Sequence, residues 1–341
     1  VPMTVTRREV LQLSAAVAAG AAVPGAVQAE EAGTPAPIAA LEAANDNVQP
    51  ITLDERRQRV ARAQQLMRQH DIDAVVLAGG SGMLYFTGTR WWNSERFFGA
   101  VLTRQGDPAW VTPAFEEGRA REKIEIGDDV RAWEEHESPH ALVAEILRER
   151  QATDRVGIEE TVKFVFSDGI AQALPAARVV SATPVTAGCR QVKDEHELAI
   201  MRQANRDTVR AHRAVFQSLE AGMTQGDVSA MSREAHRRLG MSGGALVLFG
   251  PDAAFPHGTR HPRPLQEGDF VLVDGGGKLH DYSSDITRTQ IFGEPSKRQR
   301  RIWDVVRQAQ RAAFEALRPG VEAQAIDAAA RTVLDDAGFG P

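Results

Sequence analysis

The stretch 271–289 constrains the fold most strongly, because two short apolar strands flank a glycine-rich connection and each carries an Asp where it meets that connection. Alternation along a strand puts Leu272 and Asp274 on one face, and it puts Asp285 and Thr287 on one face. An antiparallel hairpin can turn both faces the same way, so two carboxylates are predicted to meet on an apolar sheet. Unpaired charge is costly there, and a divalent metal is the simplest physical reason to keep both.

The size and charge of the chain limit the class of protein to which it can belong. With 341 residues it has room for two domains, and its 43% hydrophobic and 25% charged residues are typical of a soluble globular protein. A net charge of −6 and the lack of a basic cluster argue against a nucleic-acid partner. Cys189 is the only cysteine, which excludes an intrachain disulfide, a thiolate zinc cluster and a CxxC redox pair. We expect a partly buried thiol there.

Residues 1–29 are predicted to be a twin-arginine-type signal peptide, which places the mature protein in the periplasm or outside the cell. Arg7 and Arg8 precede a weakly apolar, Ala-rich run, and small residues before Glu30 offer a cleavage site. The run is too short for a good membrane span, so none is expected. An amphipathic N-terminal helix in a cytoplasmic protein is the alternative. Residues 30–50, rich in Ala, Pro, Glu and Asn, are predicted to be a disordered linker.

Residues 51–190 are predicted to form an α/β domain, because helical and strand-like runs alternate. Helices are expected at about 52–70 and around 138–150, and strands at 73–78, 99–103, 109–113, 156–159 and 179–182. The run 78–82, Ala-Gly-Gly-Ser-Gly, follows a strand but lacks GxGxxG spacing and a helix opening on it. That argues against a nucleotide site.

Residues 191–341 are predicted to begin a second domain with a long helix, capped by Asp194 and Glu197 and ending near Gly222. A second helix is expected from Thr224 to Gly240. The pattern of residues 214–222 returns at 312–320, so a helical hairpin is predicted to occur twice.

The repeat carries a further expectation about the length of the protein. Strand-rich sequence with Asp274 and Asp285 follows the first hairpin, whereas the sequence ends at Pro341 soon after the second. If the repeat governs the fold, a second set of strands is missing and the chain is a fragment of a longer protein.

Histidines are the other candidates for chemistry. His257 lies in a loop before the strand that bears Asp274, where an imidazole can hydrogen-bond a substrate carbonyl or move a proton. His261 makes an H-x3-H pair with it, but the prolines and glycine around the pair make a zinc-binding helix improbable. His280 is expected to be exposed in the glycine-rich connection. His212 and His236 fall on helices, where surface placement is the default.

The second domain resembles the catalytic domain of the pita-bread metallopeptidases, which include aminopeptidase P, prolidase, methionine aminopeptidase and the related creatinase. The matching stretches are 193–202, 255–258, 267–276 and 282–289, of which Asp274 with Ser-Asp285-Ile-Thr-Arg-Thr is the most specific. Residues 51–190 resemble the N-terminal domain of creatinase, prolidase and aminopeptidase P. The resemblance implies an α/β N-terminal domain plus an α+β pita-bread C-terminal domain, the latter incomplete.

The resemblance also implies roles. Asp274 matches the Asp that binds one metal through both oxygens, Asp285 the Asp that bridges two metals, and His257 the substrate-side His. Two divalent ions (Mn, Co or Zn) about 3.5 Å apart would activate a bridging water. The family completes its site with a His and two Glu that are absent from this chain. The 341 residues alone are therefore expected to be inactive, and a full-length parent to be a hydrolase.

The N-terminal domain implies the proline-directed branch of the family, which cleaves the bond before Pro in a dipeptide or at a peptide N-terminus. The aromatic, charged loop 91–96 is similar to loops that close over a neighbour's site, which implies a homodimer; packing of its Trp residues within the domain is the alternative. Two other functions stay open. One is a creatinase-like C–N hydrolase without metal, and the other is a non-catalytic peptide-binding module.

Overall fold

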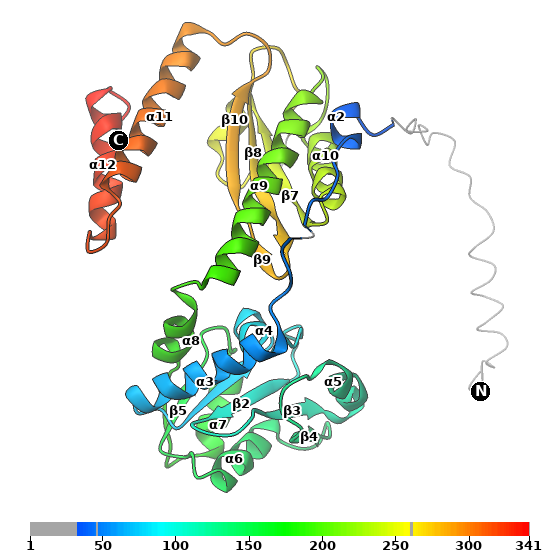
Figure 1. Ribbon diagram of the computed structural model, residues 1–341, viewed down its shortest axis with the longest axis vertical. Coiled ribbons are helices and arrows are strands. Elements are labelled where there is room, and N and C mark those ends of the chain that lie inside the picture. Colours follow the sequence, from blue (N-terminus) through cyan, green and yellow to red (C-terminus); the bar gives the residue numbers. More distant parts are fainter. Residues whose placement is uncertain (1–32, 46, 260–261, 341) are drawn as a thin grey trace, which may run out of the picture.

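The computed structural model describes residues 33–340 except 46 and 260–261. Figure 1 shows two lobes joined by α9 (Glu195–Gln217) and by the chain that precedes α3 (Leu53–Gln69), with a separate helical pair beside the second lobe. The predicted signal segment 1–29 and His261 lie outside the described residues. Within the described ranges, none of the helices combines the length and apolarity needed to cross a bilayer.

The first lobe is built on a mixed six-stranded sheet. Its central strand β1 (Ala74–Ala78) pairs antiparallel with β2 (Gly99–Thr103) and parallel with β5 (Arg155–Ile158). β1, β2 and β3 (Ala109–Pro113) are buried along their whole length, as expected from their largely apolar sequences. In sheet order the strands are β4 (Val130–Trp133), β3 (Ala109–Pro113), β2 (Gly99–Thr103), β1 (Ala74–Ala78), β5 (Arg155–Ile158) and β6 (Arg178–Ser181).

Helices cover both faces of this sheet and give two buried clusters, one on each side. The predicted α/β character is confirmed, and Cys189 is buried, which raises the pKa of its thiol to about 11. The helices are α3 (Leu53–Gln69), α4 (Ser81–Thr87), η1 (Ala114–Glu116), α5 (Glu117–Lys123), α6 (Pro139–Glu149), α7 (Phe164–Ala173) and α8 (Thr183–Arg190).

One local prediction in this lobe was wrong. A helix, α4, does open on the glycine-rich run after β1, and it begins at Ser81. Gly80 precedes it with φ of +142°, a conformation that glycine adopts without the strain that a Cβ brings. The helix could not be predicted from the sequence because Gly and Ser, which begin it, are weak helix formers.

The second lobe packs two helices on one face of a strongly twisted antiparallel sheet. α9 begins after Asp194 and α10 after Thr224, each with a complete capping box, as predicted. The elements are α9 (Glu195–Gln217), α10 (Gln225–Arg238), β7 (Ser242–Phe249), η2 (Gly250–Ala254), β8 (Phe270–Leu279), β9 (Tyr282–Ser283) and β10 (Ile286–Ile291).

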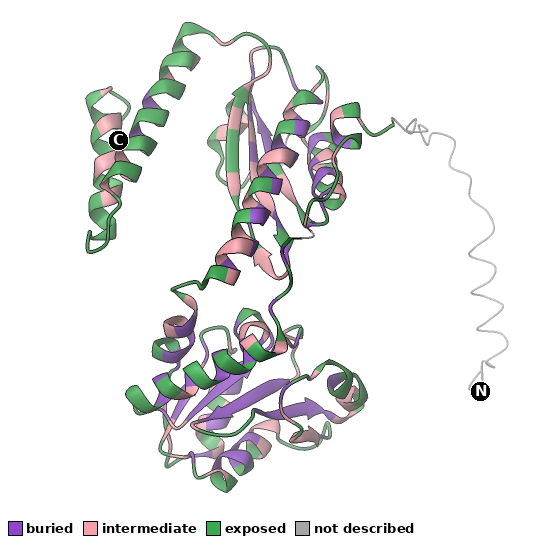
Figure 2. Ribbon diagram, viewed as in Figure 1, coloured by how far each residue is buried: buried purple, intermediate pink, exposed green. Residues whose placement is uncertain are grey.

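The two faces of this sheet differ in environment. Val271, Val273 and Leu279 of β8 are buried against α9 and α10, whereas the alternate side chains point to the other face. Figure 2 shows the contrast between the buried strands of the first lobe and the partly exposed β10. The chemistry-bearing residues of the hairpin therefore lie on the side of the sheet away from the helices.

The predicted second helical hairpin is present as α11 (Lys297–Ala316) and α12 (Ala323–Asp336). These helices pack against each other and stand apart from the sheet in Figure 1. Several large apolar side chains of this hairpin are exposed, including Phe314 of α11 at 77% and Leu317, which follows α11, at 59%. The repeat seen in the sequence thus corresponds to a repeat in structure.

The segment predicted as a disordered linker differs from expectation over its described part. Ala36–Ala39 form a short helix, α2, and Ile38 and Val48 are buried in the core of the second lobe. Arg210 and Arg238 donate hydrogen bonds to backbone carbonyls of the segment. A few apolar side chains are enough to dock it, although its average composition is that of a linker.

Candidate metal centre

The β8–β10 hairpin brings the two predicted aspartates to one face. Asp274 pairs with Thr287 and Gly275 with Ile286, and the same register continues through β9 to the turn. Asp285 lies two residues from Thr287, so it shares the face of Thr287 and of Asp274. Diagonal neighbours of this kind have Cβ atoms about 7–8 Å apart or less, a span that two carboxylates sharing a cation can bridge.

The glycine-rich segment is part of a strand, which corrects the expectation of a glycine-rich connection. Gly275, Gly276 and Gly277 belong to β8, and the turn is made by His280 and Asp281, both with positive φ. A Cβ on Gly276 would lie 2.0 Å from the Ser284 carbonyl oxygen. Glycine is needed here for the close approach of the two backbones.

The two carboxylates are less enclosed than predicted. Asp274 is half-buried and Asp285 is exposed, because the described residues place no second layer over this face. Because Asp285 keeps its contact with water, desolvation gives less reason for a metal in the hairpin than the sequence suggested. The orientation of Asp274 is nevertheless defined, since the Thr287 hydroxyl donates a hydrogen bond to its Oδ1.

The His257 loop lies on the same face as the aspartates. A Cβ on Gly258 would lie 3.5 Å from Leu246 and 3.6 Å from Leu248, and Leu246 pairs with Asp274 across the β7–β8 ladder. His257 itself is exposed and not helical, as the loop prediction required. The three site residues expected from the sequence thus share one side of one sheet.

The carboxylates of Asp274 and Asp285 are the type of oxygen ligand that a hard divalent cation prefers, and the Thr287 hydroxyl holds one of them. They fit as two of its ligands only: over the ranges that the structure describes, no group of three or more His, Cys, Asp or Glu is placed to hold a metal. Asp274 and Asp285 could therefore supply two of the ligands of a metal centre, which further ligands would have to complete.

A buried polar layer lies between the hairpin and the helices, and it corrects the expectation for two histidines. His212 is 1% exposed and His236 is fully buried, with ring centroids 6.0 Å apart. Burial lowers the pKa of both imidazoles. The neighbouring Thr208 and Ser284 are also buried and hydrogen-bonded to each other at 2.6 Å.

The signal that could have identified these residues is the helical stripe to which they belong. Ile200, Ala204, Thr208, Ala211 and Val215 are all buried on α9 at intervals of three or four residues. His212 follows Thr208 by one helical turn, so it falls on the same stripe.

The turn of the hairpin is tied to the first lobe by a buried network. Tyr282 donates to Glu197 at 2.7 Å and accepts from Arg59 at 2.9 Å, and Arg59 lies 3.2 Å from Glu197. Asp281 forms ion pairs with Arg56 and Arg90. His280, expected to be exposed, is half-buried because its Nε2 bonds the Val48 carbonyl at 2.9 Å.

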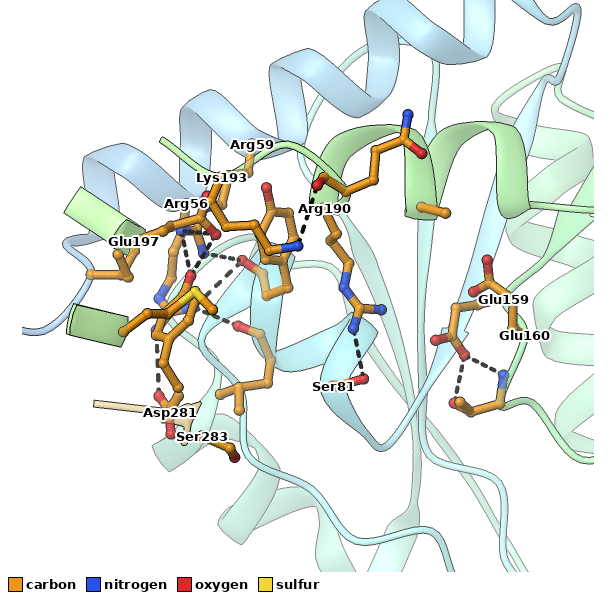
Figure 3. A pocket seen from close by; sticks show the side chains of 18 of the residues that line it. Arg56, Arg59, Ser81, Glu159, Glu160, Arg190, Lys193, Glu197, Asp281 and Ser283 are labelled. Atoms are coloured by element: carbon orange, nitrogen blue, oxygen red, sulfur yellow. Dashed lines mark hydrogen bonds and ion pairs between the residues drawn. The ribbon is translucent and has the colours of Figure 1, made fainter. Parts of the chain in front are cut away.

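A cavity of about 730 Å³ lies beside this network, between the lobes (Figure 3). Its charged lining is balanced: Arg56, Arg59, Arg190 and Lys193 against Glu159, Glu160, Glu197 and Asp281. Since most of these groups already have partners within the wall, we locate the candidate chemistry on the open face of the hairpin rather than in this cavity.

The loop 91–96 divides into a packed part and an exposed part. Trp91 stacks on Phe98 with ring centroids 3.9 Å apart, whereas Trp92 is 87% exposed. Arg96 pairs with Glu135, which raises the pKa of its guanidinium. The packing interpretation therefore holds for Trp91, and Trp92 is available to a partner surface.

Two family models together match most of the chain. Residues 59–192 match the creatinase/prolidase N-terminal domain, and residues 199–341 match metallopeptidase family M24. A probable dipeptidase, PepE of Mycobacterium tuberculosis, is 36% identical over 286 residues, which cover 82% of this chain and 76% of that protein. An Xaa-Pro dipeptidase of Pyrococcus furiosus is 26% identical and covers 83% and 79%.

Solved structures agree with these matches. The crystal structure of dipeptidase PepE from Mycobacterium ulcerans superposes with a TM-score of 0.77 at 32% identity, covering 85% of this chain and 79% of that one. A dipeptidase from Pyrococcus horikoshii gives a TM-score of 0.72 at 27% identity, covering 83% and 79%. The expected combination of a creatinase-type N-terminal domain with a pita-bread domain is confirmed.

Proposed function

The chain belongs to metallopeptidase family M24, with a creatinase/prolidase N-terminal domain, and from this premise we propose that the native protein hydrolyses the peptide bond preceding proline, while the 341 residues alone are inactive. Peptidase activity follows from the family. The proline-directed specificity is supported by relatives named Xaa-Pro dipeptidase and by the presence of the N-terminal domain. The substrate would be a dipeptide or the N-terminus of a short peptide that contains proline.

The observation that carries the metal part of the proposal is the shared face of Asp274 and Asp285. Asp274 and Asp285 would hold the divalent ions, with Mn, Co or Zn as the candidate metals. Bound ions of this kind polarise a carbonyl and lower the pKa of a bound water. The hydrogen bond from Thr287 fixes the orientation of the Asp274 carboxylate.

His257 is proposed as the substrate-side group. Its loop lies over Leu246 and Leu248, beside the aspartates, so an imidazole there can donate a hydrogen bond to a peptide carbonyl on the same face. Its exposure leaves it free to meet a substrate.

Two further proposals concern assembly and location. The exposed Trp92 supports a homodimer in which the loop 91–96 covers a neighbour's site. The Arg7-Arg8 segment supports twin-arginine export to the periplasm or the medium.

The test combines metal binding with substrate choice. Calorimetric titration of Mn²⁺ into the 341-residue chain should show binding that Asp285→Asn weakens strongly. The native protein should hydrolyse Ala-Pro in preference to Ala-Ala, and only with metal. The same assay on the 341-residue chain tests the expectation that it is inactive. Equal Mn²⁺ binding by the variant, or metal-independent hydrolysis, would overturn the proposal.

A further inference from the structure

Two side chains of α9, one helical turn apart, contact the backbone on both sides of Asp285. Thr208 and His212 lie on the same face of α9 beneath the hairpin. Thr208 contacts Ser284, the residue before Asp285, and His212 contacts Ile286, the residue after it. The exposed carboxylate is thus flanked by two residues that are anchored from the buried side.

The Thr208 contact is one link in a chain of hydrogen bonds that crosses the hairpin. Ser284 donates to the Gly277 carbonyl at 3.0 Å and accepts from the Gly277 N–H at 2.9 Å. With its proton used in this way, the Ser284 hydroxyl accepts from Thr208 at 2.6 Å. Thr208 therefore holds Ser284 where its hydroxyl bonds both the N–H and the carbonyl of Gly277 in β8.

The His212 contact defines a tautomer. Its Nε2 lies 2.9 Å from the Ile286 carbonyl oxygen, which can only accept, so Nε2 carries the proton. The Nδ1 atom is buried without a hydrogen-bond partner among the described residues. Ile286, the residue after Asp285, pairs with Gly275, the residue after Asp274. His212 therefore contacts the hairpin next to both aspartates.

We propose that Thr208 and His212 are positioning residues for the metal-binding face, fixing Asp285 through Ser284 and Ile286. The inference rests on the proposed function, because it assigns these residues to the geometry of the same site. Residues that orient ligands in this way typically account for about 10- to 100-fold in metal affinity. Loss of either contact should therefore lower the affinity for the metal more than it lowers the stability of the fold.

Matched substitutions separate positioning from simple packing. Thr208→Val removes the hydroxyl at constant shape, and Thr208→Ser restores it. His212→Phe removes the donor, and His212→Gln restores an N–H at a similar reach. Thr332→Val on α12 and His136→Phe in an exposed loop are controls for the same changes away from the site.

The readouts are the Mn²⁺ dissociation constant from calorimetry, the EPR spectrum of bound Mn²⁺, and the thermal midpoint of the metal-free protein. We expect about tenfold weaker binding and a broadened EPR signal for Thr208→Val and His212→Phe. Thr208→Ser and His212→Gln should recover most of the affinity, and the controls should match the wild type. If a donor-deleting variant does not fold, its donor-restoring partner still gives the comparison with the wild type.

The outcomes distinguish failure of the proposed function from failure of the positioning role. If Asp285→Asn binds Mn²⁺ as tightly as the wild type, the proposed function fails. If Asp285→Asn loses binding while Thr208→Val and His212→Phe bind like the wild type, the positioning role alone is overturned. The same holds if affinity only follows the thermal midpoint and the donor-restoring variants give no recovery.

Discussion

Thr287 lies directly opposite Asp274 in the β8–β10 ladder, and its hydroxyl donates a hydrogen bond to the Asp274 carboxylate. A carboxylate held by one oxygen presents the other in a fixed direction. This relationship links the register of the hairpin to the chemistry of its open face, because any change of register would also separate the pair.

The Thr287 hydroxyl is expected to matter for metal affinity and little for folding. Thr287→Val should weaken Mn²⁺ binding about 10- to 100-fold, since the Asp274 carboxylate loses the group that orients it, and Thr287→Ser should restore most of the loss. Thr289→Val is the matched control, because Thr289 shares the strand and face but pairs with Leu272. Calorimetric titration with Mn²⁺ measures these affinities. Equal affinities for the Thr287→Val and Thr289→Val variants would contradict the expectation.

Gly276 is expected to tolerate no side chain. A Cβ there would lie 2.0 Å from the Ser284 carbonyl oxygen, so Gly276→Ala must push β8 and the Ser284–Asp285 segment apart. We expect loss of Mn²⁺ binding and a lower thermal midpoint. In contrast, Gly118 lies in α5 with nothing within 4 Å of its added Cβ, and Gly118→Ala should stabilise the protein by about 0.5–1 kcal/mol. Similar thermal midpoints for Gly276→Ala and Gly118→Ala would contradict the expected clash with the Ser284 carbonyl.

Local patterns in the sequence predicted much of this site. Alternation placed Asp274 and Asp285 on one face, because the side-chain period of a strand is fixed and both residues belong to one hairpin. The helix starts at Asp194 and Thr224 were equally predictable, since a capping box acts within four residues.

Tertiary placement explains what the sequence did not predict. Whether His212 and His236 face the core depends on which stripe of α9 and α10 the sheet covers, and the sheet is formed by residues far along the chain. The exposure of Asp285 similarly depends on what covers the open face. Ile38 and Val48 dock an Ala- and Pro-rich segment through contacts that its own composition does not reveal.

The buried ion pair between the lobes should dominate the stability of their junction. The Arg59 and Glu197 side chains are 8% and 3% exposed, so Glu197→Ala would leave a buried guanidinium without its carboxylate, at a cost of about 3–5 kcal/mol. Tyr282→Phe keeps the ion pair and should cost about 1.5–3 kcal/mol. Glu315→Ala, in an exposed pair with Arg311, should change stability by less than about 0.5 kcal/mol. Urea unfolding followed by circular dichroism measures all three, and an equal effect of the buried and exposed changes would refute this ranking.

A second junction pair, Glu55 of α3 and His196 of α9, introduces a dependence on pH. His196 Nδ1 lies 2.6 Å from Glu55 Oε1. Burial favours the neutral form of Glu55, but hydrogen bonds from Thr52 and His196 outweigh it and lower the Glu55 pKa to about 2. The hydrogen bond to Glu55 raises the pKa of His196 above its ordinary value of 6.5.

The stabilisation by this pair is therefore expected to be greatest at mildly acidic pH. The Glu55 contribution is present above its unfolded pKa of 4.5 and is lost as the pH falls toward 2. The His196 contribution is complete below its unfolded pKa of 6.5 and is lost as the pH rises through the higher folded value. The thermal midpoint of His196→Gln should fall furthest below that of the wild type between roughly pH 4.5 and 6.5, and the gap should narrow above neutral pH. A gap that widens with pH would mean that His196 is neutral in its bond to Glu55, and the ionic description of this junction would then be wrong.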